Sequence, residues 1–202
     1  LVGLPLDGPD GKTFRLRLET LARGAATPLL VGALGMGEKE TDDLPTNSAF
    51  LMGPGGAFLA RYDKSRLVPG MEWAGYRAGS PGNLMEVGDL TIGALICYES
   101  IFGSLTRRYG EGGATLLVNL TSDVWFGNPR RWPGKGFLVQ HPAHLVMRAV
   151  ETRVGVARAA NGGLSLLLDP LGRALTEPLP PGPGLAMANI PVVEGRTLFS
   201  RT

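Results

Sequence analysis

The amino-acid sequence predicts a mixed α/β fold, in which helices pack against β-sheets. Apolar runs of strand length alternate with helical patterns early in the chain, and short strands joined by turns follow late. The composition agrees, because 30 glycines and 16 prolines are scattered without a period and mark many short connections. We therefore expect a single domain that spans residues 1–202.

Strand and helix signals alternate in the first part of the chain. The run 1–6 predicts a short buried strand closed by Pro5, and the apolar spacing at 14–21 predicts a helix. The other expected elements are a strand at 28–34, an exposed acidic loop at 35–47, a hairpin of strands 49–52 and 57–62 around a glycine-rich turn, and an irregular stretch at 63–89.

The near-continuous apolar run 90–96 predicts a strand that is covered on both faces. This strand ends directly before Cys97. The elements expected after it are a helix at 100–109, a strand at 114–120, a loop at 121–135, a helix at 137–151, and strands at 154–159, 164–168, 173–175 and 184–190.

The composition excludes several classes of protein. With 44% hydrophobic and 19% charged residues, the chain is neither disordered nor collagen-like. The net charge of +2 is small, so we expect no nucleic-acid partner. The single cysteine excludes intrachain disulfides and zinc sites built from several cysteines. Apolar runs such as 164–168 are far shorter than the roughly 18 residues that cross a bilayer, so no membrane span is expected within these residues.

Cys97 stands where the buried strand meets the beginning of a helix. Free N–H groups and the positive end of the helix dipole at such a point favour a thiolate over a thiol and can hold an oxyanion. This position suggests a nucleophile. The alternative is a small core residue, which is the commoner role of a lone cysteine at the end of an apolar strand.

Other polar residues are weaker candidates when taken singly. A lysine in the position of Lys64 is most often simply solvated, and glutamates such as Glu72 and Glu99 generally point to water. His141 and His144 are three residues apart on a predicted helix with no third ligand evident, which favours structural roles over a metal site. We expect neither a metal ion nor an organic cofactor.

The predicted loop 121–135 contains Trp125 and Phe126, which are followed by two arginines. This mixture suits a membrane interface, where the aromatic rings would meet acyl chains and the arginines would meet lipid phosphates. Alternatively, the aromatic rings pack inward and the arginines are merely solvated. The sequence leaves both possibilities open.

Several segments together resemble the nitrilase superfamily, in content and in order. They are YDKSRLVP at 62–69 with Glu72, CYE at 97–99, NLTSDVWFG at 119–127, QH at 140–141, RAVE at 148–151 and RAANG at 158–162. The CYE triplet and the D-x-W-F-G loop resemble the apolipoprotein N-acyltransferase branch, which acylates bacterial lipoproteins, more than the soluble amidases. The resemblance covers nearly the whole chain.

The resemblance implies a nitrilase-like four-layer α-β-β-α sandwich with a Glu-Lys-Cys triad. By resemblance, Cys97 takes an acyl group from a phospholipid as a thioester, and Lys64 stabilises the oxyanion. The N-terminal diacylglyceryl-cysteine of a lipoprotein would then accept the acyl group. Glu72 and Glu99 match acidic residues around the site. The implied substrate-binding residues are Tyr98, Trp125 and Phe126.

The sequence departs from the family pattern at the general base. The family carries a glutamate after a Leu-Pro pair, but Leu6 occupies this position here. Asp7 is a poor substitute, because neighbouring side chains on a strand point to opposite faces. If the register is right, Leu6→Glu is expected to raise activity.

The first strand-helix unit of the family domain and the transmembrane helices of the full enzyme have no counterpart in residues 1–202. The resemblance therefore implies part of a larger protein of the bacterial cytoplasmic membrane, with this domain facing the periplasm or the cell exterior. Two alternatives stay open: a soluble carbon-nitrogen hydrolase that uses the same thiolate on an amide or nitrile, and an inactive relative, which Leu6 would explain.

Overall fold

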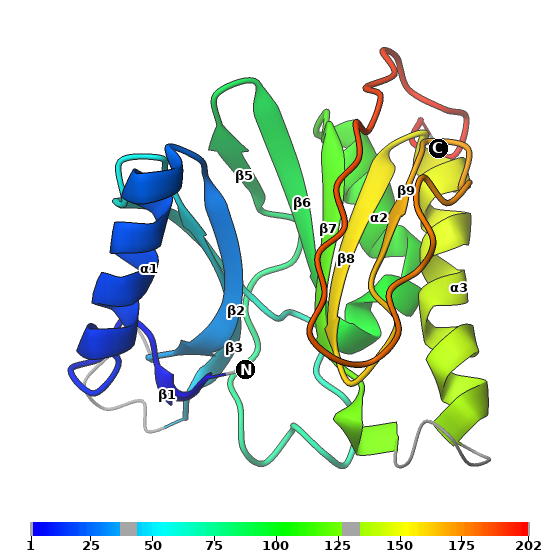
Figure 1. The fold of residues 1–202 in the computed structure, drawn as a ribbon. Coiled ribbons are helices and arrows are strands. Elements are labelled where there is room, and N and C mark those ends of the chain that lie inside the picture. Colours follow the sequence, from blue (N-terminus) through cyan, green and yellow to red (C-terminus); the bar gives the residue numbers. More distant parts are fainter. Residues whose placement is uncertain (1, 37–43, 127–133, 202) are drawn as a thin grey trace. The chain divides into compact units, whose positions relative to one another are not determined.

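The computed structural model describes residues 2–36, 44–126 and 134–201. The chain divides into two compact units, with the boundary between Asp89 and Leu90. Each unit is built on a β-sheet with helical cover on one face (Figure 1). The predicted mixed α/β class is therefore confirmed, and each unit supplies one sheet layer and one helix layer.

The first unit contains a four-stranded sheet with the order β1 (Val2–Pro5), β2 (Leu29–Gly35), β3 (Thr46–Met52) and β4 (Phe58–Asp63). The first pair is parallel and the other two pairs are antiparallel. The predicted hairpin is confirmed, since the turn 53–56 joins β3 to β4 and its last residue, Gly56, has a φ of 81°. Such a conformation favours glycine.

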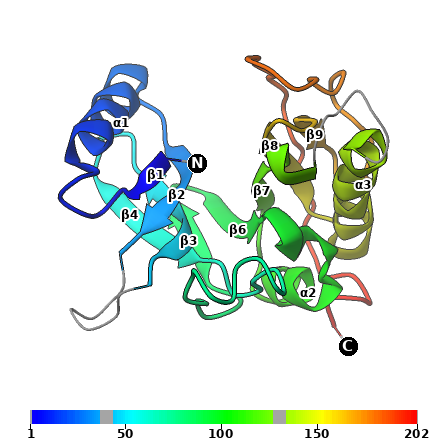
Figure 2. The ribbon, with the colours of Figure 1, turned by 90° about the horizontal axis from the view of Figure 1, so that it is seen from below.

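The helix α1 (Lys12–Ala25) lies along one face of this sheet (Figures 1 and 2). Its side chains Phe14 and Leu18 pack against a buried cluster of Leu6, Ala33 and Phe50. Leu6 follows β1 directly and is fully buried. Burial of this apolar cluster fixes α1 on the sheet and makes Leu6 a core residue of the first unit.

A strand that the sequence analysis did not predict lies in the stretch 63–89. It is β5 (Leu84–Val87), in which Met85 is buried and Glu86 is exposed. Four residues give too short an alternation to be recognised among the surrounding prolines and glycines. The predicted loop 35–47 falls largely outside the described residues, and its last two residues belong to β3 and are buried.

The second sheet has the order β5, β6 (Leu90–Ile96), β7 (Leu116–Ser122), β8 (Gly155–Asn161) and β9 (Leu166–Leu168). The strands β6, β7 and β8 are parallel, and β9 is antiparallel to β8. The helices α2 (Gly103–Glu111) and α3 (Gly134–Thr152) cover one face of it in the second unit (Figure 1). Because β6 to β8 run parallel, the chain leaves all three at the same edge, where polar side chains gather.

Two predicted elements of the second unit differ in part from the structure. The helix expected at 100–109 is a short 3₁₀ helix, η1 (Cys97–Ile101), followed by α2. The segment 173–175 makes only the isolated bridge between Leu168 and Ala174.

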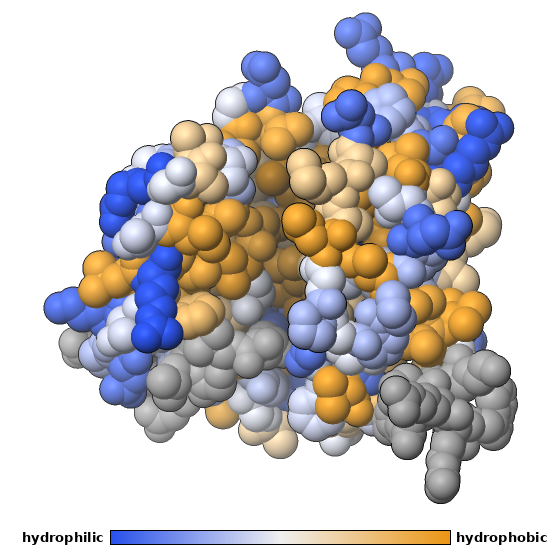
Figure 3. All heavy atoms as spheres, in the orientation of Figure 1, coloured by the Kyte–Doolittle hydropathy of each residue, from blue (hydrophilic) through white to orange (hydrophobic). Residues whose placement is uncertain are grey.

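The segment 184–190 forms no strand, and its Leu185 and Met187 are 81% and 78% exposed. An apolar run becomes a strand only where a sheet edge offers hydrogen-bond partners. Figure 3 shows other hydrophobic side chains at the surface of this unit as well. Among the described residues, no helix combines the length and the apolar character that crossing a bilayer requires.

Candidate active site

Lys64 is the first residue after β4, and its side chain is fully buried. Its backbone N–H donates to the carbonyl oxygen of Asn47 at 2.8 Å, which continues the pairing of β4 with β3. Its ammonium group donates to both carboxylate oxygens of Glu72, at 2.9 and 2.7 Å. Lys64 is therefore not a solvated surface lysine, because its charge is held inside the first unit by a carboxylate.

The turn that carries Glu72 is fixed by the same carboxylate. The backbone N–H of Val68 donates to Oε2 at 2.7 Å, and the amide Nδ2 of Asn47 donates to Oε1 at 3.2 Å. Only 14% of the Glu72 side chain is exposed. Glu72 lies eight residues after Lys64 in the sequence, and the turn between them brings the two side chains together as an ion pair. Such a pair presents a positive charge at a defined point, as stabilisation of an oxyanion requires.

Neither Leu6 nor Asp7 brings a carboxylate to this pair. Leu6 packs with Phe50 beneath α1. Asn47, which contacts Glu72, is three residues before Phe50 on β3, so its side chain lies on the opposite face of the strand. The Asp7 carboxylate accepts hydrogen bonds from Arg61 at 2.5 Å and from the backbone N–H of Met36 at 2.8 Å. Asp7 is thus engaged elsewhere, and Leu6 is part of the core.

Cys97 lies at a sharp turn between β6 and η1. Its φ is 50°, whereas the preceding residue, Ile96, is extended with a φ of −106°. Only two other non-glycine residues among the described ranges have positive φ. For a residue with a Cβ this conformation costs on the order of 1–3 kcal/mol and persists only where neighbours enforce it. The side chain is half-buried and carries a free thiol.

Glu99 stabilises this turn from within the second unit. It is fully buried, and its Oε2 accepts a hydrogen bond from the backbone N–H of Ile96 at 2.8 Å. Tyr98, on the same turn, packs edge to face against Phe102, with 5.1 Å between ring centroids. The CYE triplet is therefore a structural unit in which the glutamate holds the backbone beside the cysteine.

A buried polar network lies behind the Cys97 turn. Arg158 on β8 donates from Nη2 to Asp123 Oδ2 at 2.5 Å, from Nη1 to the side-chain oxygen of Asn119, and from Nε to the Leu164 carbonyl at 2.9 Å. The Asn119 amide in turn donates to the carbonyl of Leu95 at 3.1 Å. The network thus ties β8 and β7 to the end of β6, where the turn begins.

His141 on α3 completes this network. Its Nδ1 lies 2.9 Å from Asp123 Oδ1, and its Nε2 lies 3.2 Å from the backbone carbonyl oxygen of Cys97. The ring also packs edge to face with Phe126, at 5.7 Å between centroids. A Cβ added at Gly163 would collide with the Asp123 carboxylate, so glycine permits the close approach here.

The sequence is similar to known proteins along most of its length. Residues 9–198 match the model of the carbon-nitrogen hydrolase family. The chain belongs to the carbon-nitrogen hydrolase family. It is 37% identical over 181 residues to the apolipoprotein N-acyltransferase of Geobacter metallireducens. This match covers 81% of this chain and 33% of that protein. It is 30% identical over 194 residues to apolipoprotein N-acyltransferase 1 of Treponema pallidum, with 82% and 34% covered. The chain thus spans about one third of the length of these relatives.

Among solved structures, this family member resembles the amidase from Nesterenkonia sp.. The TM-score is 0.67 and the identity 25%, and the match covers 86% of this chain and 64% of the amidase. Another structure of this amidase shows the product of Michael addition of acrylamide at its active-site cysteine. The superfamily that the sequence resembles is therefore confirmed, and with it a fold shared with cysteine-dependent amidases.

The structure shows what several other residues singled out in this carbon-nitrogen hydrolase chain contact. His141 serves the buried network, and Arg148 pairs with Glu151, three residues further along α3, at 2.8 Å. Trp125 is 72% exposed, so it does not pack inward, whereas Phe126 stacks on Phe137 at 4.7 Å. The arginines at 130 and 131 lie outside the described residues. No group of three or more His, Cys, Asp or Glu in the described part of the chain is arranged to hold a metal ion.

Sequence reasoning did not assign roles to Asn119, Asp123 and Arg158, although all three lie in segments of the family resemblance. The signal was present, because Asn119 interrupts the apolar run of β7 and Arg158 interrupts that of β8. A polar residue inside a buried strand needs a partner of its own. The sequence does not show which of these residues pair, because Arg158 lies 35 positions from Asp123 and 39 positions from Asn119.

Asp123 and Arg158 titrate differently from exposed residues. Burial raises the pKa of Asp123, but the hydrogen bond with His141 and the charge of Arg158 outweigh it, so the pKa lies below the usual 3.8. Burial also lowers the pKa of Arg158 below its usual value, and the charge of Asp123 opposes this. Asp123 is therefore held as a carboxylate in the folded chain.

The lowered pKa of Asp123 predicts a loss of stability in acid. Its ionised form is favoured by folding, so its contribution to the free energy of unfolding is complete above pH 3.8 and declines as the pH falls through the folded-state pKa. We expect Asp123→Asn to destabilise the chain at pH 7 and the difference from wild type to shrink towards pH 3. Urea unfolding at both pH values measures this; a difference that is constant with pH would contradict it.

Proposed function

We propose that this chain carries the acyl-transfer site of an apolipoprotein N-acyltransferase, with Cys97 as the nucleophile. The observation that carries the proposal is the conformation of Cys97, whose positive φ presents a half-buried thiol on an enforced turn. The same turn bears the CYE triplet, and the chain is 37% identical to a named apolipoprotein N-acyltransferase. Strained backbone of this kind clusters at functional sites.

In the first half-reaction, the Cys97 sulfur attacks the ester carbonyl of a phospholipid. A carbon–sulfur bond forms, the ester carbon–oxygen bond breaks, and the lysophospholipid alcohol leaves with a proton, which yields a thioester. Lys64 supplies the positive charge that offsets the developing oxyanion, and Glu72 holds its ammonium group in place.

In the second half-reaction, the amine of a diacylglyceryl-cysteine attacks the thioester. The new amide bond forms as the carbon–sulfur bond breaks, and the thiol of Cys97 is regenerated with the proton lost by the amine. Glu99 is engaged with the backbone of Ile96, so in this proposal it holds the turn rather than moving protons. The resemblance places a glutamate base where Leu6 stands, and we propose that proton transfer is slow in this form for that reason.

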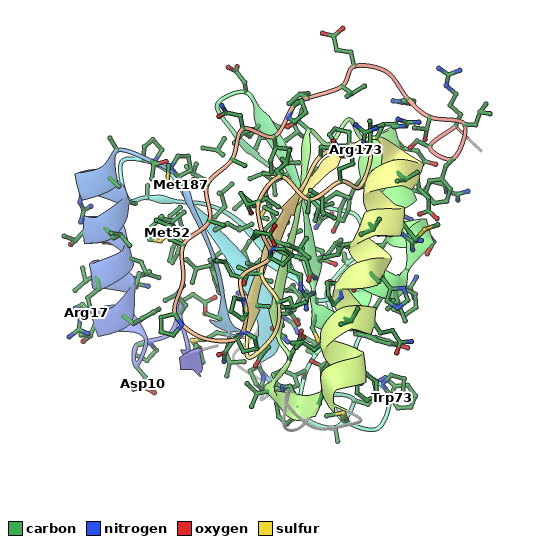
Figure 4. All side chains as sticks on the ribbon, turned by 45° about the vertical axis from the view of Figure 1, so that its right-hand side comes forward. Asp10, Arg17, Met52, Trp73, Arg173 and Met187 are labelled. Carbon is green, nitrogen blue, oxygen red and sulfur yellow. The ribbon has the colours of Figure 1, made fainter. Side chains whose placement is uncertain are left out.

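Exposed apolar side chains next to the proposed site residues suit a lipid substrate. Trp125 and Val124 are 72% and 58% exposed directly after the buried Asp123. Trp73, labelled in Figure 4, is 63% exposed directly after Glu72. We propose that Trp125 contacts acyl chains, with Phe126 and Tyr98 as packed rings beside it. In this proposal the chain is the extracytoplasmic part of a longer protein of a bacterial membrane.

An amidase-type hydrolysis is the second candidate, since the similar solved structures are amidases. The thioester would then form from an amide, with release of ammonia or an amine, and water would cleave it. One structure of that amidase is a mutant with leucine in place of a glutamate, and it shows covalent addition of the acetamide moiety of fluoroacetamide at the active-site cysteine. This finding supports reactivity of Cys97 in a chain with Leu6.

Incubation with a fluorescent phospholipid in detergent micelles tests the proposal. We expect intact-mass measurement to show one acyl adduct on the peptide that contains Cys97, and a diacylglyceryl-cysteine peptide to discharge it. Hydrolysis of short amides with no lipid adduct would favour the amidase. No adduct from either substrate would favour an inactive relative.

Leu6→Glu tests the base position, with Leu6→Gln as the matched control. The structure changes the expectation from sequence, because Leu6 is buried beneath α1. We expect both variants to lose about 2–5 kcal/mol of stability in urea unfolding, since each places a polar group in an apolar cluster. Neither should gain activity. A higher acylation rate in Leu6→Glu alone would instead support the register implied by the resemblance.

A further inference from the structure

The hydrogen bonds of His141 specify which of its ring nitrogens donates to the Cys97 turn. The carbonyl oxygen of Cys97 can only accept, so Nε2 must donate to it across 3.2 Å. On the other side of the ring, Asp123 Oδ1 lies 2.9 Å from Nδ1, and this oxygen also accepts a hydrogen bond from the Thr121 hydroxyl. The other carboxylate oxygen accepts from Arg158, whose Nη2 lies 3.3 Å from Nδ1.

The partners of Nδ1 fix the orientation of the ring. Asp123 and His141 are almost fully buried, and Nδ1 lies between the Asp123 carboxylate and the Arg158 guanidinium. The ring is therefore held on one side by these two groups and reaches the Cys97 carbonyl with Nε2 on the other.

The bond to the carbonyl acts on the strained residue itself. Cys97 is held at a φ of 50°, and its neighbour Ile96 is fixed on the other side by Glu99. The His141 bond anchors the peptide plane that follows the cysteine, and Arg158 and Asn119 connect the same network to the end of β6. The backbone of the turn is thus held by hydrogen bonds both before and after the cysteine.

We propose that His141 is a positioning residue, which is oriented by Asp123 and Arg158 and holds the Cys97 backbone in its reactive conformation through the hydrogen bond from Nε2. This inference deepens the proposed function and rests on it, because it matters for catalysis only if Cys97 is the nucleophile. His141 touches the backbone of Cys97 and makes no contact with the thiol in this role.

Nuclear magnetic resonance tests the hydrogen bonds without any substrate. Cysteine labelled with ¹³C at its carbonyl carbon gives one resonance, because the chain has a single cysteine. We expect His141→Leu to move this resonance upfield as the hydrogen bond is lost, and His141→Gln, whose amide can donate, to restore most of the shift. With ¹⁵N-labelled histidine, His144→Gln leaves one ring, and its Nε2 should carry a hydrogen.

Kinetics of the acyl adduct supply the second readout. Because a small misplacement of a reacting group costs up to about 10²-fold in rate, we expect His141→Leu to lower kcat by about 10- to 100-fold with little change in KM. His141→Gln should recover most of the loss.

The outcomes separate the two proposals. A carbonyl resonance that is unchanged in His141→Leu, or a ring whose Nε2 carries no hydrogen, would overturn the inference. A merely structural His141 would lower the melting temperature of both variants and leave kcat of the folded chain unchanged, which also overturns it. Wild-type spectra as expected, together with no acyl or amide turnover, would reject the proposed function while the hydrogen bonds stand.

Discussion

Replacing Cys97 with alanine is expected to abolish the acyl adduct while the fold stays intact. The reaction needs a nucleophilic sulfur, and Cys97 is the only cysteine in the chain. Because the side chain is half-buried on a turn held by Glu99 and His141, its loss leaves those contacts in place. Intact mass after incubation with phospholipid measures the adduct, and circular dichroism reports the fold. An adduct that persists in Cys97→Ala would remove this residue from the proposed mechanism.

Cys97→Gly is the matched control for the strained backbone. It should be as inactive as Cys97→Ala, but more stable than it by about 1 kcal/mol, because glycine adopts a φ of 50° without the clash of a Cβ. Urea unfolding of the two variants measures the difference. Equal stabilities would show that the turn is not strained, and would weaken the argument that the fold enforces the conformation of the cysteine.

Replacing Arg158 with methionine is expected to cause the largest loss of stability. Arg158 and Asp123 are each only 3% exposed, and their ion pair is buried in the second unit. Removing one partner leaves an uncompensated buried charge, which costs about 3–5 kcal/mol. For a chain of this size that corresponds to a fall of roughly 6–20 °C in melting temperature.

The exposed Arg173, labelled in Figure 4, provides the control, since Arg173→Met should change stability by less than about 0.5 kcal/mol. Arg158→Lys should fall between the two, because lysine keeps the charge but cannot reach the three acceptors that Arg158 binds. A melting temperature for Arg158→Met close to that of Arg173→Met would contradict the assignment of a buried, paired charge.

Local patterns predicted most of the regular elements. The run 90–96 is β6 with the same bounds, and the expected helices at 14–21 and 137–151 lie within α1 and α3. Prediction failed where tertiary partners decide. The segment 184–190 is apolar but is not paired as a strand, and β5 is too short for its pattern to be recognised. A strand needs a neighbour, and a sequence window does not show which segments become neighbours.

By itself, the sequence determined the class of the fold, the superfamily and the residues that deserve a test, because apolar periodicity and motif order are properties of the linear chain. Only the tertiary structure decided that Lys64 is paired with Glu72, that Leu6 is buried beneath α1, and that His141 binds the Cys97 carbonyl. Those facts depend on which groups share a buried space. Burial sets the cost of leaving a polar group without a partner, and hence which partners it must have.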